Sequence, residues 1–393
     1  MADARPTTDA ALLLSDLAEF RRLSAALSYM LTAAKGSSQR LLEMILGERS
    51  LPDRERDEVV ELIEYVLRAW AGSRRRLGPS SALHPLRATT LLVKVLPEVR
   101  TLDLAVALLH DKVEDVTPAT KPPHEWNELE GWFQRIRRKM DPDGSWNLDD
   151  RLEALSRLDR MESYCAYLGR LIAASFTFPD VMRAKLADRL DNTLDYSIDF
   201  RDPLDAVDFF EQVFQCLYVP SWRGPVTAER QRPTPPLELS WRLYSLYKNI
   251  VLVSLLRATG GVPTDAAGAA LMEGLIDASV KEAQRIGLEL LVHHRPELAG
   301  GRDLLLDVMA YCCSAAAVRV TGPQGAHRLD GLLVDTFDTP DPKARVKKLQ
   351  ELAENRTLLF EGAVAFLALL SGFRNDPAFR VEGIGPEGVR PVG

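Results

Sequence analysis

The feature that most constrains this chain is a group of ionisable side chains on a stretch that is otherwise apolar and has a helical period. Residues 101–115 carry His110, Asp111, Glu114 and Asp115 among leucine, valine and alanine side chains. Side chains four residues apart share one face of a helix, so His110 should lie beside Glu114 and Asp111 beside Asp115. Burying acids and a histidine costs several kcal/mol unless a cation or a partner compensates. A bound divalent metal ion is the simplest compensation.

Two other segments supply further candidate ligands. His84 stands at the start of a helix predicted over residues 85–95. Asp188 and Asn192 are four residues apart on an apolar helix predicted over residues 180–198, so both side chains should lie on one face. We therefore predict that the fold gathers imidazoles and carboxylates from three helical segments around one cation. The predicted metal ligands are His84, His110, Asp111 and Asp188.

A simpler explanation is that these are ordinary core residues, because a single histidine or aspartate on an apolar helix is commonly satisfied by hydrogen bonds. Four such residues in a chain with 6 histidines favour a metal site instead. Nitrogen and oxygen ligands without thiolates suit Mn²⁺, Fe²⁺, Zn²⁺ or Mg²⁺. A two-metal centre would need more histidines before Asp188, and His124 in a proline-rich loop is the only candidate, so we predict one ion.

The acids that follow the His–Asp pair are candidates for catalysis. A metal ion lowers the pKa of a bound water, and a neighbouring carboxylate can then take the proton of that water. We predict that Glu114 and Asp115 position and deprotonate this water. The alternative is that both acids form a solvated helix end.

This arrangement resembles a known family. Along the chain a histidine, His84, is followed by the pair His110-Asp111 and then by a distant aspartate, Asp188. This order of ligands is similar to the motif of the HD-domain metal-dependent phosphohydrolases. The acid pair and the run from Lys185 to Asn192 further resemble the hydrolase domain of RelA/SpoT-type alarmone enzymes, which remove the 3′-pyrophosphate of (p)ppGpp. The resemblance covers about residues 60–200 and implies an HD-type helical bundle, Mn²⁺ as the cofactor and a nucleotide as the substrate.

The resemblance also implies substrate-binding residues. Arg75-Arg76-Leu77-Gly78 lies shortly before the first predicted ligand, where the family has an Arg-Lys-Ser-Gly loop that binds guanine. Arg75 and Arg76 would therefore stack on a base or grip a phosphate, although basic clusters are commonly solvent-facing. Lys185 would contact a phosphate or form a structural ion pair, and Asn192 matches the sugar-contacting asparagine of the family.

Two departures from the family pattern leave the substrate open. Leu77 replaces the loop serine and Asp191 replaces a histidine, at positions that surround the nucleoside in the family. The leading hypothesis is a guanosine 3′,5′-bis(diphosphate) 3′-pyrophosphohydrolase. The alternatives are an HD phosphohydrolase for another nucleotide, such as NADPH or a nucleoside triphosphate, and a non-catalytic regulatory protein that senses a nucleotide. The intact acid pair weighs against the sensor, which has little need of a general base.

The amino-acid composition narrows the classes of protein to which this chain could belong. The net charge of −7 over 393 residues argues against a nucleic-acid binder, which would carry a basic excess. The 4 cysteines show no Cys-x-x-Cys spacing, which fits a reducing cytoplasm. The N-terminus lacks the layout of a signal peptide, and no run of about 18 uncharged apolar residues occurs. We therefore expect a cytoplasmic protein without a membrane span.

Helical periods dominate the chain and no strand alternation appears, so we predict an all-α fold. An HD-domain helical bundle would be followed by a second helical module. The C-terminal helices could cover the site, bind a partner or form a homo-oligomer. The predicted divisions are a disordered tail at 1–8, the HD-type phosphohydrolase domain with its N-terminal helices at 9–219, a Pro-rich linker at 220–236, a helical module of unknown role at 237–372 and a loose tail at 373–393.

Overall fold

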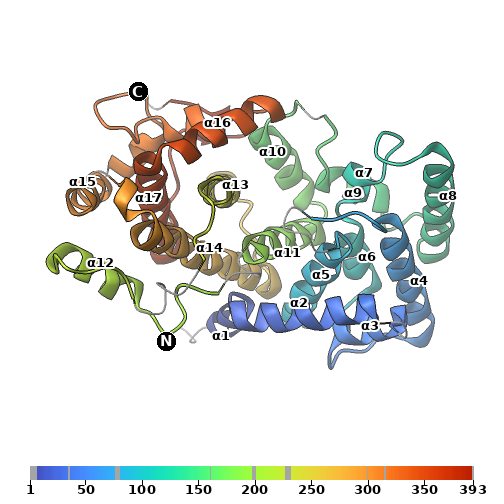
Figure 1. Cartoon of the computed structure of the whole chain (residues 1–393). Helices are drawn as coiled ribbons and strands as arrows, with labels where there is room; N and C mark the ends of the chain where they lie inside the picture. The colour runs from blue at the N-terminus through green and yellow to red at the C-terminus, as the bar shows by residue number, and fades with distance from the viewer. Residues whose placement is uncertain are drawn as a thin grey trace, which may run out of the picture. The chain divides into compact units, whose positions relative to one another are not determined.

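The prediction of an all-α fold is confirmed. The computed structural model describes residues 7–33, 36–75, 80–159, 161–196, 201–225, 232–298, 300–313 and 316–391. These residues form helices α1 to α17, a few short 3-10 or π-helical turns and one two-stranded antiparallel hairpin (Figure 1).

The chain folds into two compact units. The first contains Met1–Asp159, Arg170–Asp195 and Val262–Leu275, and the second contains Arg160–Gly169, Tyr196–Gly261 and Ile276–Gly393. The boundaries fall inside α10 (Tyr164–Ser175) and α14 (Ala266–His293), so each of these helices contributes residues to both units. The predicted domains are continuous stretches of chain. Composition and periodicity do not show that one unit is built from several separate stretches.

The first unit is built around α5 (Leu83–Val95). Every residue from Leu83 to Val93 is buried, as expected of a helix that packs on all sides. Against it pack α2 (Leu17–Thr32), α3 (Ser38–Leu46), α6 (Thr101–Leu109) and α11 (Pro179–Asp195). The remaining helices that lie wholly in this unit are α1 (Thr7–Leu14), α4 (Asp53–Ala69), α7 (Lys112–Asp115), α8 (Pro123–Met140) and α9 (Leu148–Leu155). The predicted ligands lie on α5 and α11 or directly after α6, so the candidate site belongs to this core.

Side-chain caps explain two of the helix starts in the first unit. The carboxylate of Asp16 accepts hydrogen bonds from the amides of Ala18 and Glu19, which satisfies free amides at the start of α2. The hydroxyl of Ser37 accepts the amide of Arg40 in the same way at the start of α3. Such caps stop a helix from extending backwards, and Asp16 therefore separates α1 from α2.

The second unit is built around α13 (Pro236–Thr259), most of whose residues are buried. α16 (Pro342–Glu354) and α17 (Arg356–Asn375) pack on it, and α12 (Phe209–Tyr218) packs on α15 (Gly301–Cys313). The predicted linker over 220–236 ends where Pro236 begins α13, and residues 226–231 of it lie outside the described residues. Trp222 in that linker is buried, and its indole donates a hydrogen bond to Gln212 (3.2 Å).

Of the segment predicted as a loose tail, residues 373–393, the described part 373–391 makes defined contacts. α17 continues to Asn375, and β1 (Ile384–Gly385) pairs with β2 (Gly388–Val389). Val381 and Val389 are buried. The guanidinium of Arg257 donates hydrogen bonds to backbone carbonyls in this segment. Glycine and proline content predicts irregular backbone, but it does not show whether other elements hold that backbone in place. Of the predicted N-terminal tail, residues 1–6 lie outside the described residues.

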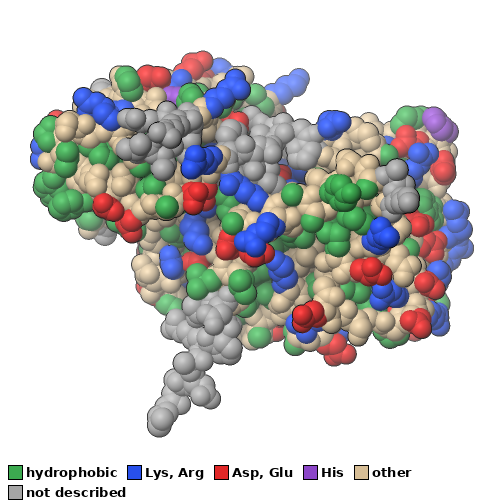
Figure 2. All heavy atoms as spheres, turned by 60° about the horizontal axis from the view of Figure 1, so that its bottom comes forward, with side chains coloured by type: hydrophobic (Ala, Val, Ile, Leu, Met, Phe, Trp, Pro, Cys, Tyr) green, Lys and Arg blue, Asp and Glu red, His purple; other side chains and the backbone are tan. Residues whose placement is uncertain are grey.

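Among the described helices, α17 is the one that is long and apolar enough to cross a membrane. Its most apolar window is 61% buried inside the structure, which is also the behaviour of the core helix of a folded unit. On the face drawn in Figure 2, Lys and Arg side chains are interspersed with Asp and Glu side chains. This mixture agrees with the modest net charge of the sequence.

Candidate metal centre

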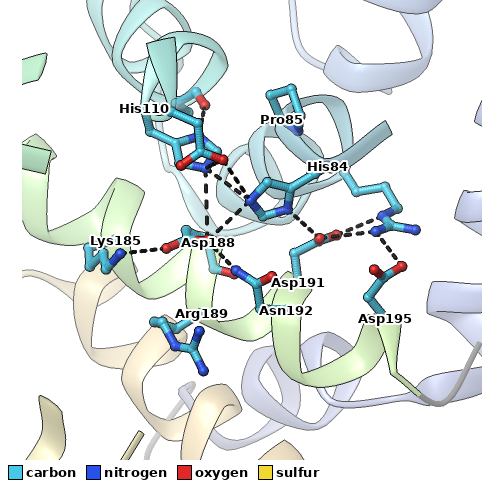
Figure 3. A network of polar contacts seen from close by, with 12 residues as sticks. His84, Pro85, His110, Lys185, Asp188, Arg189, Asp191, Asn192 and Asp195 are labelled. Atoms are coloured by element: carbon cyan, nitrogen blue, oxygen red, sulfur yellow. Dashed lines mark hydrogen bonds and ion pairs between the residues drawn. The ribbon is translucent and has the colours of Figure 1, made fainter. Parts of the chain in front are cut away.

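Side chains from three segments of the first unit come close together, and Figure 3 shows His84, His110 and Asp188 among them. His84 lies in the first turn of α5, Asp188 lies within α11, and His110 and Asp111 follow the last residue of α6. The Nε2 atoms of His84 and His110 are 3.0 Å apart. His84 Nε2 also lies 3.1 Å from Asp188 Oδ1 and 3.4 Å from Asp111 Oδ2. The structure thus brings together the four residues that the sequence proposes as ligands.

The other ring nitrogen of each histidine already has an acceptor. His110 Nδ1 lies 2.8 Å from the carbonyl oxygen of Ala107, and His84 Nδ1 lies 2.6 Å from Asp191 Oδ2. A carbonyl and an ionised carboxylate only accept hydrogen bonds, so both Nδ1 atoms carry protons. The Nε2 lone pairs of the neutral imidazoles then point into the same space as two carboxylate oxygens. Lys185 and Asn192 already donate to the carboxylate of Asp188. However, the Nε2 atoms of both histidines and Asp111 Oδ2 face one another, and these acceptors repel unless a proton or a metal ion lies between them.

The pKa values of both histidines are raised, which also shows that the surrounding carboxylates favour a positive charge here. Burial and Arg75 act to lower the pKa of His84, but the carboxylates around it, chiefly Asp191, raise it to about 10. Burial also acts to lower the pKa of His110, and Asp111 raises it above its ordinary value. Without a metal ion the cluster therefore binds protons. A divalent cation would replace these protons, since metal binding and proton release are coupled.

A break in the predicted helix positions His110 and Asp111. The sequence predicts one helix over residues 101–115, whereas α6 ends one residue before His110 and α7 is a separate turn. In a continuous helix the carbonyl oxygen of Ala107 would accept the amide of Asp111. Here this oxygen accepts the Nδ1 proton of His110. The prediction of one continuous helix is therefore wrong at the point where a side chain competes with the backbone for a carbonyl.

The two acids predicted to act on water are the last two residues of α7 and are exposed, as the alternative of a solvated helix end also expects, and they lie near Asp111. Glu114 accepts a hydrogen bond from the backbone amide of Arg157 (2.6 Å), and Asp115 accepts one from the indole of Trp70 (2.9 Å). Partial desolvation of the two carboxyl groups raises the pKa of both, and the negative charge of Asp111 raises both further. A carboxylate with a raised pKa is a stronger base near neutral pH, as a general base requires.

The cluster opens to solvent on one side. The side chain of Asp111 is 32% exposed, whereas those of His84 and Asp188 are 6% and 5% exposed. Lys185, one of the predicted substrate residues, lies beside the cluster with its Nζ 2.7 Å from Asp188 Oδ2. It therefore adds a positive charge that an anionic ligand could use.

The other predicted substrate residues are joined to one another. Arg75 Nη2 donates a hydrogen bond to Asn192 Oδ1 (2.6 Å), and Arg75 Nε lies 2.8 Å from Asp195 Oδ2. The amide nitrogen of Asn192 donates to the carbonyl oxygen of Asp188 (3.0 Å). Arg75 and Asn192 therefore lie together next to the cluster. Arg76 lies outside the described residues.

Sequence reasoning missed a layer of charge behind His84. Asp191 binds both His84 and Arg87, and Arg87 Nη2 also lies 2.5 Å from Asp195 Oδ1. The family pattern predicts Asp191 beside the nucleoside, but its side chain is 0% exposed and lies behind the histidine, so this expectation is wrong. Burial acts to raise the pKa of Asp191, while Arg87 and His84 lower it to about 2. The available signal was the recurrence of Asp188, Asp191 and Asp195 on one face of an apolar helix.

A second group of possible ligands lies in the second unit and differs in its charge balance. Asp307, His327 and Glu361 place a nitrogen and carboxylate oxygens close together. Arg328 Nε donates to Glu361 Oε2 (3.0 Å), and Arg328 Nη2 lies 3.7 Å from Asp307 Oδ2. Because an arginine already supplies the positive charge, this group does not require a metal ion.

Comparisons with protein-family models, with curated proteins and with solved structures find no match to this chain. The argument for a function therefore depends on the residues of the cluster and on the groups that surround them.

Proposed function

We propose that this protein is a metal-dependent phosphohydrolase that cleaves a phosphate or pyrophosphate ester of a nucleotide. One observation carries the proposal: ligand atoms of His84, His110 and Asp111 lie within 4.8 Å of one another, with Asp188 Oδ1 3.1 Å from His84 Nε2, while Nδ1 of both histidines is already used. Two imidazole nitrogens and two carboxylate oxygens suit Mn²⁺, the cofactor that the resemblance implies, and also other divalent ions. A bound ion would polarise a phosphoryl oxygen and lower the pKa of a water.

The acids beside the cluster would handle the proton of the attacking water. Glu114 and Asp115 are exposed at the end of α7, and partial desolvation together with the nearby charge of Asp111 raises the pKa of both. The amide of Arg157 and the indole of Trp70 hold one oxygen of each carboxylate, so the proton acceptors are positioned before a substrate binds. Either carboxylate could then accept a proton from water as the phosphate ester is cleaved.

The substrate that we propose first is guanosine 3′,5′-bis(diphosphate), with release of the 3′-pyrophosphate. The motif order and the acid pair support it, together with Arg75 and Asn192, which lie beside the cluster. Lys185 would pair with a phosphate oxygen. Arg75 is bound to Asp195 and Asn192, so its guanidinium would have to exchange one of these partners to contact a nucleotide.

A hydrolysis assay tests this proposal. The full chain is loaded with Mn²⁺ and incubated with guanosine 3′,5′-bis(diphosphate), and the guanosine diphosphate and pyrophosphate formed are separated by anion-exchange chromatography. Asp111→Ala removes one carboxylate of the cluster and should abolish turnover. Asp149→Ala removes a 51% exposed carboxylate on α9 and should leave turnover unchanged. Equal turnover by Asp111→Ala and the unaltered protein would refute the proposed site.

A substrate panel distinguishes the alternatives. NADPH and nucleoside triphosphates are tested under the same conditions, because Leu77 departs from the guanine-binding loop of the family. Hydrolysis of one of these instead would keep the phosphohydrolase and change its substrate. Tight nucleotide binding without hydrolysis, with each of Mn²⁺, Mg²⁺, Zn²⁺ and Fe²⁺, would favour the non-catalytic sensor.

A further inference from the structure

The charge layer behind His84 begins with a carboxylate that is bound from two directions. Asp191 Oδ2 lies 2.6 Å from His84 Nδ1 (Figure 3). Arg87 binds both oxygens of the same carboxylate, with Nε 2.7 Å from Oδ1 and Nη2 3.1 Å from Oδ2. The side chains of Asp191 and Arg87 are 0% exposed, and that of His84 is 6% exposed. Water therefore has little access to exchange these contacts.

Arg87 is itself held in place by other groups. Its Nη1 donates a hydrogen bond to the hydroxyl of Ser24 (3.0 Å), and its Nη2 lies 2.5 Å from Asp195 Oδ1. Its guanidinium carbon lies 5.0 Å from the centre of the Phe20 ring. A guanidinium is planar and can only donate hydrogen bonds, so its fixed position determines how the carboxylate of Asp191 is turned.

We infer that Asp191 and Arg87 are positioning residues for the metal centre, an inference that rests on the proposed function. Asp191 accepts the Nδ1 proton of His84 and thereby keeps the Nε2 lone pair directed at the oxygens of Asp111 and Asp188. Arg87 acts through Asp191 by binding both of its oxygens and holding the carboxylate in this orientation. Groups that orient a metal-binding histidine in this way typically contribute about 10–100-fold to metal affinity.

The same helix offers a matched control. Asp180 lies on α11 like Asp191, its side chain is 5% exposed, and Arg151 Nε lies 2.8 Å from its Oδ2. Arg151 also lies over an aromatic ring, with its guanidinium carbon 4.1 Å from the centre of Phe178. This pair has the burial and the chemistry of Asp191 and Arg87, but its contacts do not include a histidine of the cluster. Any effect of losing a buried ion pair in general should therefore appear in both pairs.

Asp191→Asn is the most informative substitution because it keeps the size of the side chain. Arg87 only donates, so the amide oxygen of the asparagine should face Arg87 and its NH₂ group should face His84 Nδ1. His84 would then have to accept a hydrogen bond at Nδ1 and carry its proton on Nε2. That proton occupies the lone pair that a metal ion needs, so metal affinity should fall.

The experiment is a titration of the full-length protein with Mn²⁺, followed by the electron paramagnetic resonance signal of free Mn²⁺. We expect the affinity of Asp191→Asn to fall about 10–100-fold and that of Asp180→Asn to stay within about 2-fold of the unaltered protein. At a Zn²⁺ concentration that saturates only the unaltered protein, the proton on His84 Nδ1 should give a proton–nitrogen NMR signal in the unaltered protein and in Asp180→Asn. Asp191→Asn, in which His84 carries its proton on Nε2 and does not bind the ion, should lack this signal. Arg87→Lys, compared with Arg151→Lys, should give an intermediate loss of affinity.

The outcomes separate this inference from the proposed function. Failure of the unaltered protein to bind Mn²⁺ would overturn the proposed function and the inference together. Equal Mn²⁺ affinity of Asp191→Asn and the unaltered protein would overturn the inference alone. An equal loss of affinity in Asp180→Asn and Asp191→Asn would also overturn it, because it would show a general loss of stability. If Asp191→Asn does not fold, the Mn²⁺ affinities of Arg87→Lys and Arg151→Lys are compared instead. Equal affinities of these two variants would overturn the inference.

Discussion

Replacing Arg87 by methionine should destabilise the folded protein strongly. The substitution keeps much of the side-chain volume and removes the positive charge, which leaves the buried carboxylates of Asp191 and Asp195 with fewer donors. Breaking a buried ion pair by removing one partner costs about 3–5 kcal/mol. At roughly 2–4 °C per kcal/mol for a unit of this size, the expected fall in Tm is about 6–20 °C.

The assay is chemical denaturation at pH 7 in the presence of a chelator, so that metal binding does not contribute. Arg100→Met is the matched control, since Arg100 also pairs with a buried aspartate, Asp103, but is itself 56% exposed. An exposed pair contributes at most about 1 kcal/mol, and Asp103 keeps Arg183 as a second partner. A free energy of unfolding for Arg87→Met that lies within about 1 kcal/mol of that for Arg100→Met would refute the buried network.

Three further predictions concern the cluster and its neighbours. Adding Mn²⁺ at about 100 times its Kd should raise the free energy of unfolding by about 2.7 kcal/mol, and Asp111→Ala should remove this gain in a thermal melt. Asp115→Asn should stabilise the metal-free protein at pH 7. Because partial desolvation and the charge of Asp111 raise the folded-state pKa of Asp115, ionisation destabilises the folded protein as the pH rises above about 4, so the gain should be small and should vanish in denaturation curves at lower pH. Lys185→Met should weaken binding of a non-hydrolysable nucleotide about 10-fold by calorimetry, since it removes one charge-assisted hydrogen bond; unchanged affinity would exclude Lys185 from the nucleotide site.

The sequence predicts the helices well, and it also predicts which ionisable side chains of the first unit lie near one another, because both leave a periodic signal. The apolar period of the segment around His84 requires a buried helix, and the structure buries every residue from Leu83 to Val93. Asp188 and Asn192 are four residues apart, and α11 places both next to the cluster. Burying an imidazole or a carboxylate is costly unless it is paired, so the sequence itself predicts that these side chains share a partner.

The contacts that fix the site were harder to predict, since they depend on side chains that are distant in sequence. The break after α6 depends on His110 taking the carbonyl of Ala107, and a pattern of apolar residues has the same period with or without that bond. The pairing of Asp191 with Arg87 joins α11 to α5, and nothing in either segment alone specifies it. The family motif also predicts Asp191 on the substrate side. In the structure its side chain is 0% exposed and contacts His84 in the core.

The most direct test of the metal centre is anomalous diffraction from crystals of the full chain grown with Mn²⁺, measured on both sides of the manganese absorption edge. A single manganese peak is expected about 2 Å from Nε2 of both His84 and His110, with oxygens of Asp111 and Asp188 completing the site. A map without a peak there, in which the two Nε2 atoms remain within hydrogen-bond distance of each other, would contradict the proposal that these four residues bind a metal ion.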